Sequence, residues 1–163
     1  MNTPFPPPPV IDFARLIAWA IVDESVHWTG RQTLFVGDKL LGAVPRLAIC
    51  QNISGPLTDV LLFHCNDEWE VQGVSGAKSH EAVREIAERA YEGITAKWQE
   101  VNVSPAAAEA WIRENRPSYV CAFCGKLPTE MANFFHSEKA AICSGCVQEM
   151  HRQMHSQPGT NDA

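Results

Sequence analysis

Two Cys-x-x-Cys motifs near the C-terminal end constrain this chain more than any other feature. Cys121 and Cys124 form the first motif, and Cys143 and Cys146 form the second after eighteen intervening residues. Each motif bends the backbone into a knuckle whose two thiolates point the same way. Two knuckles supply the four soft ligands of a tetrahedral structural zinc site and leave no open position for water. The spacing therefore predicts one structural Zn²⁺ per chain, held by all four cysteines.

The residues next to the motifs predict the local fold. Gly125 directly follows the first knuckle, where a turn with positive φ favours glycine. After the second knuckle, Val147, Met150 and Met154 recur on one face of a predicted helix. A knuckle, a short middle segment and a second knuckle at a helix start together outline a treble-clef finger.

Other interpretations of these cysteines are weaker. A redox Cys-x-x-Cys motif usually occurs singly and near a βαβ pattern, and two disulfides would be unusual in a reducing compartment. His136 lies between the motifs and has a metal-binding side chain, but four thiolates already complete the shell. We therefore interpret His136 as a surface residue or a neighbour of the ligands.

Further residues around the knuckles match the pattern of a known family. Phe123 lies inside the first knuckle, Gly125 and Lys126 follow it, and Ile142 and Val147 flank the second. With the spacing between the knuckles, residues 119–155 resemble the zinc-binding domain at the start of the ClpX unfoldase. The resemblance implies a finger that forms dimers and captures substrates and adaptor proteins. Residues 131–137 depart from the family, which usually has an Ala-Gly-Pro turn there.

Length and charge limit the class of protein. The 163 residues suffice for one ordinary domain and a finger, and a composition of 45% hydrophobic and 20% charged residues is that of a globular chain. The net charge is −6, and residues 117–163 carry three basic against four acidic side chains. Recognition of DNA or RNA needs several phosphate-contacting cations, so we expect no nucleic-acid partner.

The N-terminal region predicts neither secretion nor membrane insertion. Residues 1–9 hold five of the eleven prolines and no positive charge, unlike a signal peptide. The apolar stretch 10–22 contains Asp12 and Arg15 and is too short to span a bilayer. Because the zinc site requires reduced thiols, we expect a cytoplasmic protein, and the resemblance to the ClpX domain implies a bacterial one.

The hydrophobic patterns predict an α+β domain over residues 10–116. Asp12 is expected to cap a helix that continues to residue 22, with Phe13, Leu16, Ile17 and Ile21 at helical spacing. Short runs at 33–36, 47–53, 60–65 and 69–74 predict three or four antiparallel strands, with a tight turn at Asn66. A helix capped by Ser79 and ended by Gly93, a strand over 94–98 and a helix from Ser104 complete the domain.

The predicted organisation has four parts. Residues 1–9 form a Pro-rich disordered tail, residues 10–116 an antiparallel sheet with two or three helices, and residues 117–155 the small C4 finger. Residues 156–163 form a second disordered tail. A Pro-rich ligand for a partner is an alternative for residues 1–9.

No set of residues in the sequence amounts to an active site. The segment from Gly73 to Ser79 lacks the spacing of a phosphate loop, so no nucleotide is expected. His64 and Cys65 are adjacent in a predicted strand and point to opposite faces, so they cannot pair as base and nucleophile. Cys50 and Cys65 are expected to be buried thiols, and His151 and His155 to face solvent.

These patterns favour a non-enzymatic protein whose finger mediates protein–protein contact. The nine apolar side chains of the finger exceed what its interior can bury, so a partner surface is expected, with a homodimer favoured. The alternative is an immunity or inhibitor protein. In that case the α+β domain binds a toxin, and the finger serves only as a structural staple.

Overall fold

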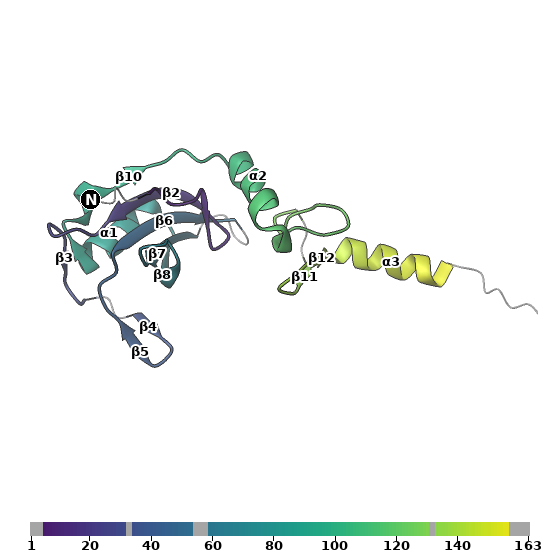
Figure 1. Ribbon diagram of the computed structural model, residues 1–163, viewed down its shortest axis with the longest axis horizontal. Helices are drawn as coiled ribbons and strands as arrows, with labels where there is room; N and C mark the ends of the chain where they lie inside the picture. Colours follow the sequence, from purple (N-terminus) through teal and green to yellow (C-terminus); the bar gives the residue numbers. More distant parts are fainter. Residues whose placement is uncertain (1–4, 32–33, 54–58, 131–132, 157–163) are drawn as a thin grey trace, which may run out of the picture. The chain divides into compact units, whose positions relative to one another are not determined.

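The computed structural model of this protein describes residues 5–31, 34–53, 59–130 and 133–156 (Figure 1). The chain divides by its contacts into two compact units, Met1–Ala108 and Glu109–Ala163. The sequence predicts a boundary after residue 116. In the structure the division falls inside a helix, so the last two turns of that helix belong with the finger.

The first unit is built on a six-stranded antiparallel sheet, which confirms the predicted α+β class. Its central order is β1-β2-β6-β7-β8, and the short strand β10 pairs with β2 beside β1. The strands are β1 (Val10–Ile11), β2 (Ala14–Ile21), β6 (Arg46–Asn52), β7 (Val60–Cys65), β8 (Val71–Ala77) and β10 (Gln99–Glu100).

Strand β2 replaces the helix predicted over residues 12–22, and that prediction is wrong. The strand is buried on both faces, so its sequence is a nearly continuous apolar run. A buried helix gives the same pattern, and periodicity alone does not distinguish the two. A register shift between Leu16 and Ala18 moves the alternation by one residue, and Ala18 therefore faces the opposite side from Leu16. This bulge gives the apolar residues their apparent helical spacing.

Asp12 does not cap a helix. Asp12 and Phe13 form the two-residue turn between β1 and β2, with φ of 42° and 60°. Positive φ at both central positions is the geometry of a type I′ hairpin turn, whose twist matches that of the flanking strands. Asp tolerates this conformation better than most residues, because its short side chain bonds locally.

Helix α1 (His80–Ala90) covers one face of the sheet, as predicted. The Ser79 hydroxyl accepts a hydrogen bond from the Ala82 N–H at 3.2 Å and caps the helix. Val83, Ala87 and Ala90 are fully buried against the strands. The helix ends at Ala90 with Tyr91 as its C-cap, so the prediction that Gly93 ends it is wrong. Gly93, with φ of 94°, instead precedes the tight turn over Ile94–Lys97 (η1), which replaces the strand predicted at 94–98. Residues 99 and 100, one step later, form β10.

The opposite face of the sheet carries Trp19, Phe63 and Trp69 and is covered in part by residues 5–9. The Trp69 indole N–H donates to the Phe5 carbonyl at 3.1 Å, and the Leu16 N–H donates to the Pro9 carbonyl at 3.0 Å. Pro7 is buried. Residues 5–9 therefore do not form the expected disordered tail, and residues 1–4 lie outside the described part of the chain.

Two small antiparallel pairs of strands complete the first unit. Strand β3 (His27–Trp28) pairs with β9 (Tyr91–Glu92), and β4 (Leu34–Val36) pairs with β5 (Lys39–Leu41). The loop from β7 to β8 spans residues 66–70, and the Asn66 carboxamide accepts the N–H groups of Glu68 and Glu70. The positive φ of that loop falls on Trp69, at 66°, rather than on Asn66.

The second unit contains the finger. Helix α2 (Pro105–Asn115) begins at the predicted Ser104-Pro105 signal and spans the division between the units. A short turn η2 (Pro117–Tyr119), the hairpin of β11 (Phe134–His136) and β12 (Ala141–Cys143), and helix α3 (Ser144–Ser156) follow. The tail predicted over 156–163 lies outside the described residues except for Ser156, which ends α3. No helix in the described ranges is long and apolar enough to span a bilayer.

Candidate metal centre

The two knuckles meet at one point of the second unit. Backbone hydrogen bonds hold the first: the Cys121 N–H donates to the Lys126 carbonyl, and the Gly125 N–H donates to the Cys121 carbonyl, both at 2.9 Å. Gly125 has a φ of 72°, which confirms the predicted need for glycine. Cys143 ends strand β12, and Cys146 lies in the first turn of α3. This order of knuckle, hairpin and helix start is that of a treble clef.

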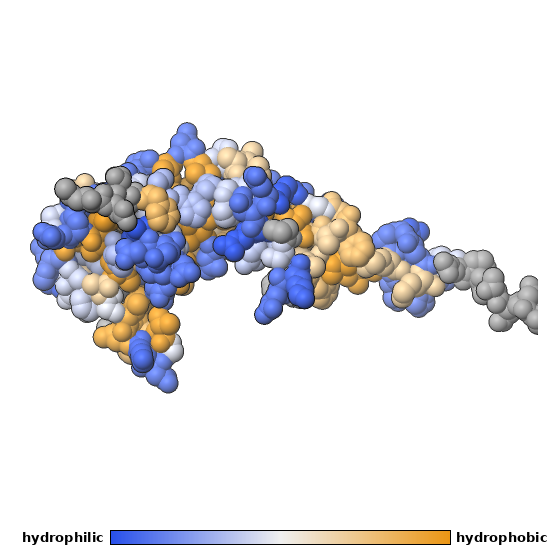
Figure 2. All heavy atoms as spheres, viewed as in Figure 1, coloured by the Kyte–Doolittle hydropathy of each residue, from blue (hydrophilic) through white to orange (hydrophobic). Residues whose placement is uncertain are grey.

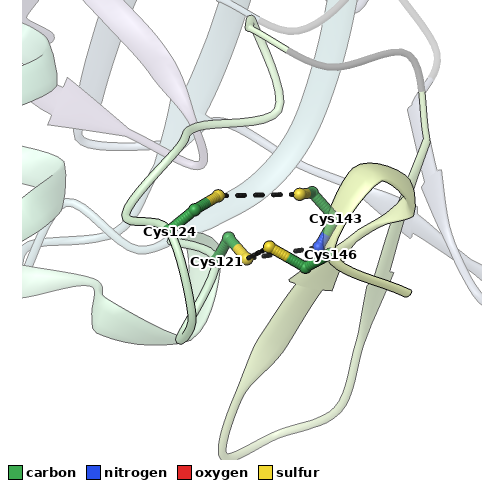
Figure 3. A group of neighbouring side chains, drawn as sticks. All are labelled: Cys121, Cys124, Cys143 and Cys146. Carbon is green, nitrogen blue, oxygen red and sulfur yellow. Dashed lines mark hydrogen bonds between the residues drawn. The ribbon is translucent and has the colours of Figure 1, made fainter. Parts of the chain in front are cut away.

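All four sulfur atoms lie within 4.8 Å of one another (Figure 3). The Sγ–Sγ distance is 3.7 Å between Cys121 and Cys146 and 3.6 Å between Cys124 and Cys143. Each short contact thus joins one cysteine of the first knuckle to one of the second. The structure brings together the four residues that the sequence predicts, and they form a cluster that could hold one metal ion.

The distances fit a metal site better than disulfides. A disulfide needs an S–S separation of about 2 Å, well below those observed. A tetrahedral site with Zn–S bonds of about 2.3 Å places its sulfur atoms about 3.8 Å apart. Both short contacts lie close to that value, so four thiolates here could surround a single ion and leave no position open.

The four cysteines differ in their exposure to solvent. Cys121 and Cys143 are buried, Cys146 is half-buried, and Cys124 is exposed. Burial raises the pKa of Cys121, but the backbone N–H groups of Cys124, Cys143 and Phe123 outweigh it and bring this pKa down to about 6. The thiol of Cys124, then burial and the other two cysteines, raise the pKa of Cys146 to about 12. Four thiolates at this spacing need a cation to offset their charge.

Two charged residues that the sequence does not single out hold the loop after the first knuckle. The Arg113 guanidinium on α2 donates to the Gly125 carbonyl and pairs with the Glu130 carboxylate at 3.1 Å. That carboxylate also accepts the Leu127 N–H at 2.7 Å, and Leu127 is fully buried. The sequence separations of 12 and 17 residues follow no local pattern, so only the folded chain reveals these contacts.

Among the described side chains, the metal-binding group consists of the four cysteines, and Cys50, His64 and Cys65 are not part of it. His64 and Cys65 are both buried and face opposite sides of the sheet, with His64 against Tyr91 and Cys65 in the other cluster. Burial raises the pKa of Cys50, and burial also raises the pKa of Cys65 to about 12. Gly73 and Gly76 lie within strand β8. His136 lies in β11, while His151 and His155 stack on exposed α3 at 4.2 Å between ring centroids.

The finger exposes much of its apolar surface. Phe123 is 66% exposed, Phe135 58% and Met154 70%, and Val147 is also exposed. Phe134, Ile142 and Met150 are half-buried, whereas Leu127 is buried; Met131 lies outside the described residues. No residue of α3 is buried. The expectation that one finger cannot bury all nine apolar residues is therefore confirmed for the described ones.

Comparison with protein families, with curated proteins and with solved structures finds no match to this chain.

Proposed function

We propose that Cys121, Cys124, Cys143 and Cys146 hold one structural Zn²⁺ and that the finger built on it is a protein-binding module without catalytic activity. Four thiolates form the ligand set that zinc takes in closed structural sites. The ion replaces an apolar interior that so short a segment cannot build. In this role the zinc ion stabilises the fold of the finger and does not activate water.

The main support for a binding role is the exposed apolar surface of the finger. Val147, Met150 and Met154 recur along α3, which buries none of its residues among those described. Phe123 and Phe135 add two exposed rings from the first knuckle and β11. Exposed apolar groups in such number usually mark a contact surface, and methionines suit one that adapts to its partner.

A homodimer is the partner that we favour. The resemblance of residues 119–155 to the ClpX zinc-binding domain supports this choice, because that domain pairs with itself and also binds substrates and adaptors. The finger has no excess of positive charge that would suit nucleic acid. A two-fold contact between fingers would cover the same apolar residues in both copies.

Light scattering on the full chain at tens of micromolar tests the dimer. We expect twice the chain mass for the wild type and one chain mass for the double variant Phe135→Glu, Met154→Glu. Neither residue is a ligand, so the double variant should retain its zinc. The control is Gln148→Glu, which adds a charge to exposed α3 outside the apolar stripe and should stay dimeric. A monomeric wild type would contradict the homodimer.

One observation favours the second candidate function, in which the first unit inhibits a toxin. The β4–β5 hairpin exposes Phe35, Val36 and Leu40, by 66%, 50% and 51%, and Figure 2 shows this apolar surface. Leu34 and Leu41 pair across the hairpin, and their methyl groups lie 3.1–3.2 Å from the position of a Cβ at Gly73. The hairpin is thus anchored on β8 and presents apolar side chains outward.

Native pulldown with two variants separates these candidates. If the hairpin binds a toxin, Phe35→Lys with Leu40→Lys should lose it, and Phe135→Glu with Met154→Glu should not. If the finger is the binding module, the opposite pattern is expected, with substrates or components of a protease system captured. Recovery of the same partner by both variants would contradict both assignments.

A further inference from the structure

On the second face of the sheet in the first unit, the chain's own proline-rich segment contacts Trp69 and Arg46 through Phe5. Residues 5–9 read Phe-Pro-Pro-Pro-Pro. Each of residues 5–8 precedes a proline, which excludes helix and drives the backbone into the extended polyproline conformation. This segment carries no N–H donor after Phe5, so the sheet can hold it only through its carbonyls and its rings.

Both kinds of contact are present. The Trp69 indole N–H donates to the Phe5 carbonyl at 3.1 Å. The Arg46 guanidinium carbon lies 5.1 Å from the centroid of the Phe5 ring and 5.0 Å from that of Trp69, so the cation contacts both rings. Pro7 is buried. Proline-rich segments generally dock against aromatic side chains, and here an indole lies at the start of the segment and donates to its first carbonyl.

The side chains that contact Phe5 lie outside the segment, Arg46 on β6 and Trp69 in the loop between β7 and β8. Trp19 packs edge-on against Trp69 at 5.6 Å between ring centroids, and both side chains are at least 90% buried. Arg46 is 8% exposed, pairs with Asp67 at 3.7 Å, and has a second guanidinium nitrogen, Nη1, without a hydrogen-bond partner in the described structure. A buried donor of this kind can bind a further carbonyl or carboxylate that the chain's own segment does not supply.

The segment itself is held lightly. Phe5 is 56% exposed, and residues 5–8 form no strand pairing. Polyproline conformation has no internal hydrogen bonds, so releasing the segment breaks only its few contacts with the sheet. The strand pairing of β1 with β2 starts at Val10 and does not depend on these contacts.

We propose that Trp69, Arg46 and Trp19 form a groove for a proline-rich segment of another protein, which displaces the chain's own residues 5–8. The ligand class is an aromatic residue followed by consecutive prolines. A second copy of this chain is not the expected occupant. Its segment is identical, whereas the chain's own segment is tethered beside the groove at high effective concentration. A partner that also reaches Arg46 Nη1 gains a contact that the chain's own segment lacks.

The test uses full-length, zinc-loaded protein and the indole N–H signal of Trp69, assigned by its loss in Trp69→Phe. The variant Phe5→Ala with Pro7→Ala loosens the segment and leaves the groove residues intact. We expect its Trp69 signal to move away from the wild-type position. Adding the peptide Phe-Pro-Pro-Pro-Pro-Val to the double variant should move the Trp69 signal back to the wild-type position. The apparent Kd of the peptide should be about tenfold lower for the double variant than for the wild type, because the wild-type segment competes with the peptide. The peptide with alanine in place of every proline serves as the control.

Three results would overturn the proposal. The first is a Trp69 signal that does not move in the double variant. The second is a peptide that leaves this signal unchanged at millimolar concentration, or an alanine peptide that acts as well. The third is association of wild-type chains that Phe5→Ala abolishes, because the occupant would then be a second copy.

Discussion

His64 is a buried histidine whose protonation the fold opposes. It is 2% exposed, its Nε2 has no hydrogen-bond partner within the described residues, and its ring lies 5.9 Å from that of Tyr91. Burial lowers the pKa of His64 from 6.5 to about 4. A neutral imidazole at this position is therefore part of the folded state.

This residue predicts that the first unit loses stability in mild acid. Below pH 6.5, His64 is protonated in the unfolded chain but stays neutral in the folded chain. The contribution of neutral His64 to the free energy of unfolding is therefore fully present above pH 6.5 and is lost as the pH falls toward 4. Between pH 7.5 and pH 5 the loss from His64 should be about 2 kcal/mol. Urea unfolding followed by tryptophan fluorescence measures it.

His64→Leu should remove this part of the pH dependence, whereas His27→Leu, at an exposed position, should keep it. An unchanged pH dependence in His64→Leu would show that another group is responsible.

The six cysteines should fall into two classes toward a thiol reagent at pH 8. Cys50 and Cys65 are fully buried with raised pKa values, so both are inert in the folded chain. Zinc should protect the other four until a chelator removes it. We therefore expect slow labelling of the native protein, rapid labelling of four thiols after chelation, and labelling of six only after unfolding. Rapid labelling of Cys65 in the folded protein would reopen a catalytic role.

At the scale of elements, α2 supports the metal centre through Arg113 and Glu130. Residues that orient the ligand loops of metal sites typically change metal affinity by about 10- to 100-fold when removed. We expect Arg113→Met to lower zinc affinity by about tenfold, measured by competition with a chromophoric chelator. Arg116→Met removes an exposed cation from the same region of the chain and should leave the affinity unchanged. Equal affinities for both variants would exclude the support role of Arg113.

The elements also show which parts of the fold a sequence can predict. Helix α1 follows from Ser79 and a single apolar stripe, and β6 and β7 follow from short apolar runs bounded by turn residues. Strand β2 could not be told from a helix, because it is buried on both faces and contains a bulge at Ile17. The four cysteines were predictable because their spacing is local. Arg113 and Glu130 were not, because tertiary packing alone joins them to the knuckles.

At the scale of the molecule, the two units should depend on zinc differently. The first unit has two apolar clusters on the two faces of its sheet, so we expect it to fold without an ion. In the second, zinc is expected to contribute on the order of 10 kcal/mol to folding. Chelation should therefore unfold the finger and leave the first unit intact, with unchanged fluorescence of its buried tryptophans. A loss of that fluorescence together with the zinc would contradict the independence of the units.

If the four thiolates hold one structural zinc ion, elemental analysis of dialysed protein should detect it. The wild type should contain one zinc per chain, and Cys143→Ser should contain far less after the same dialysis, although its first unit stays folded. A wild type without zinc, or a Cys143→Ser protein that retains all of it, would contradict the zinc assignment.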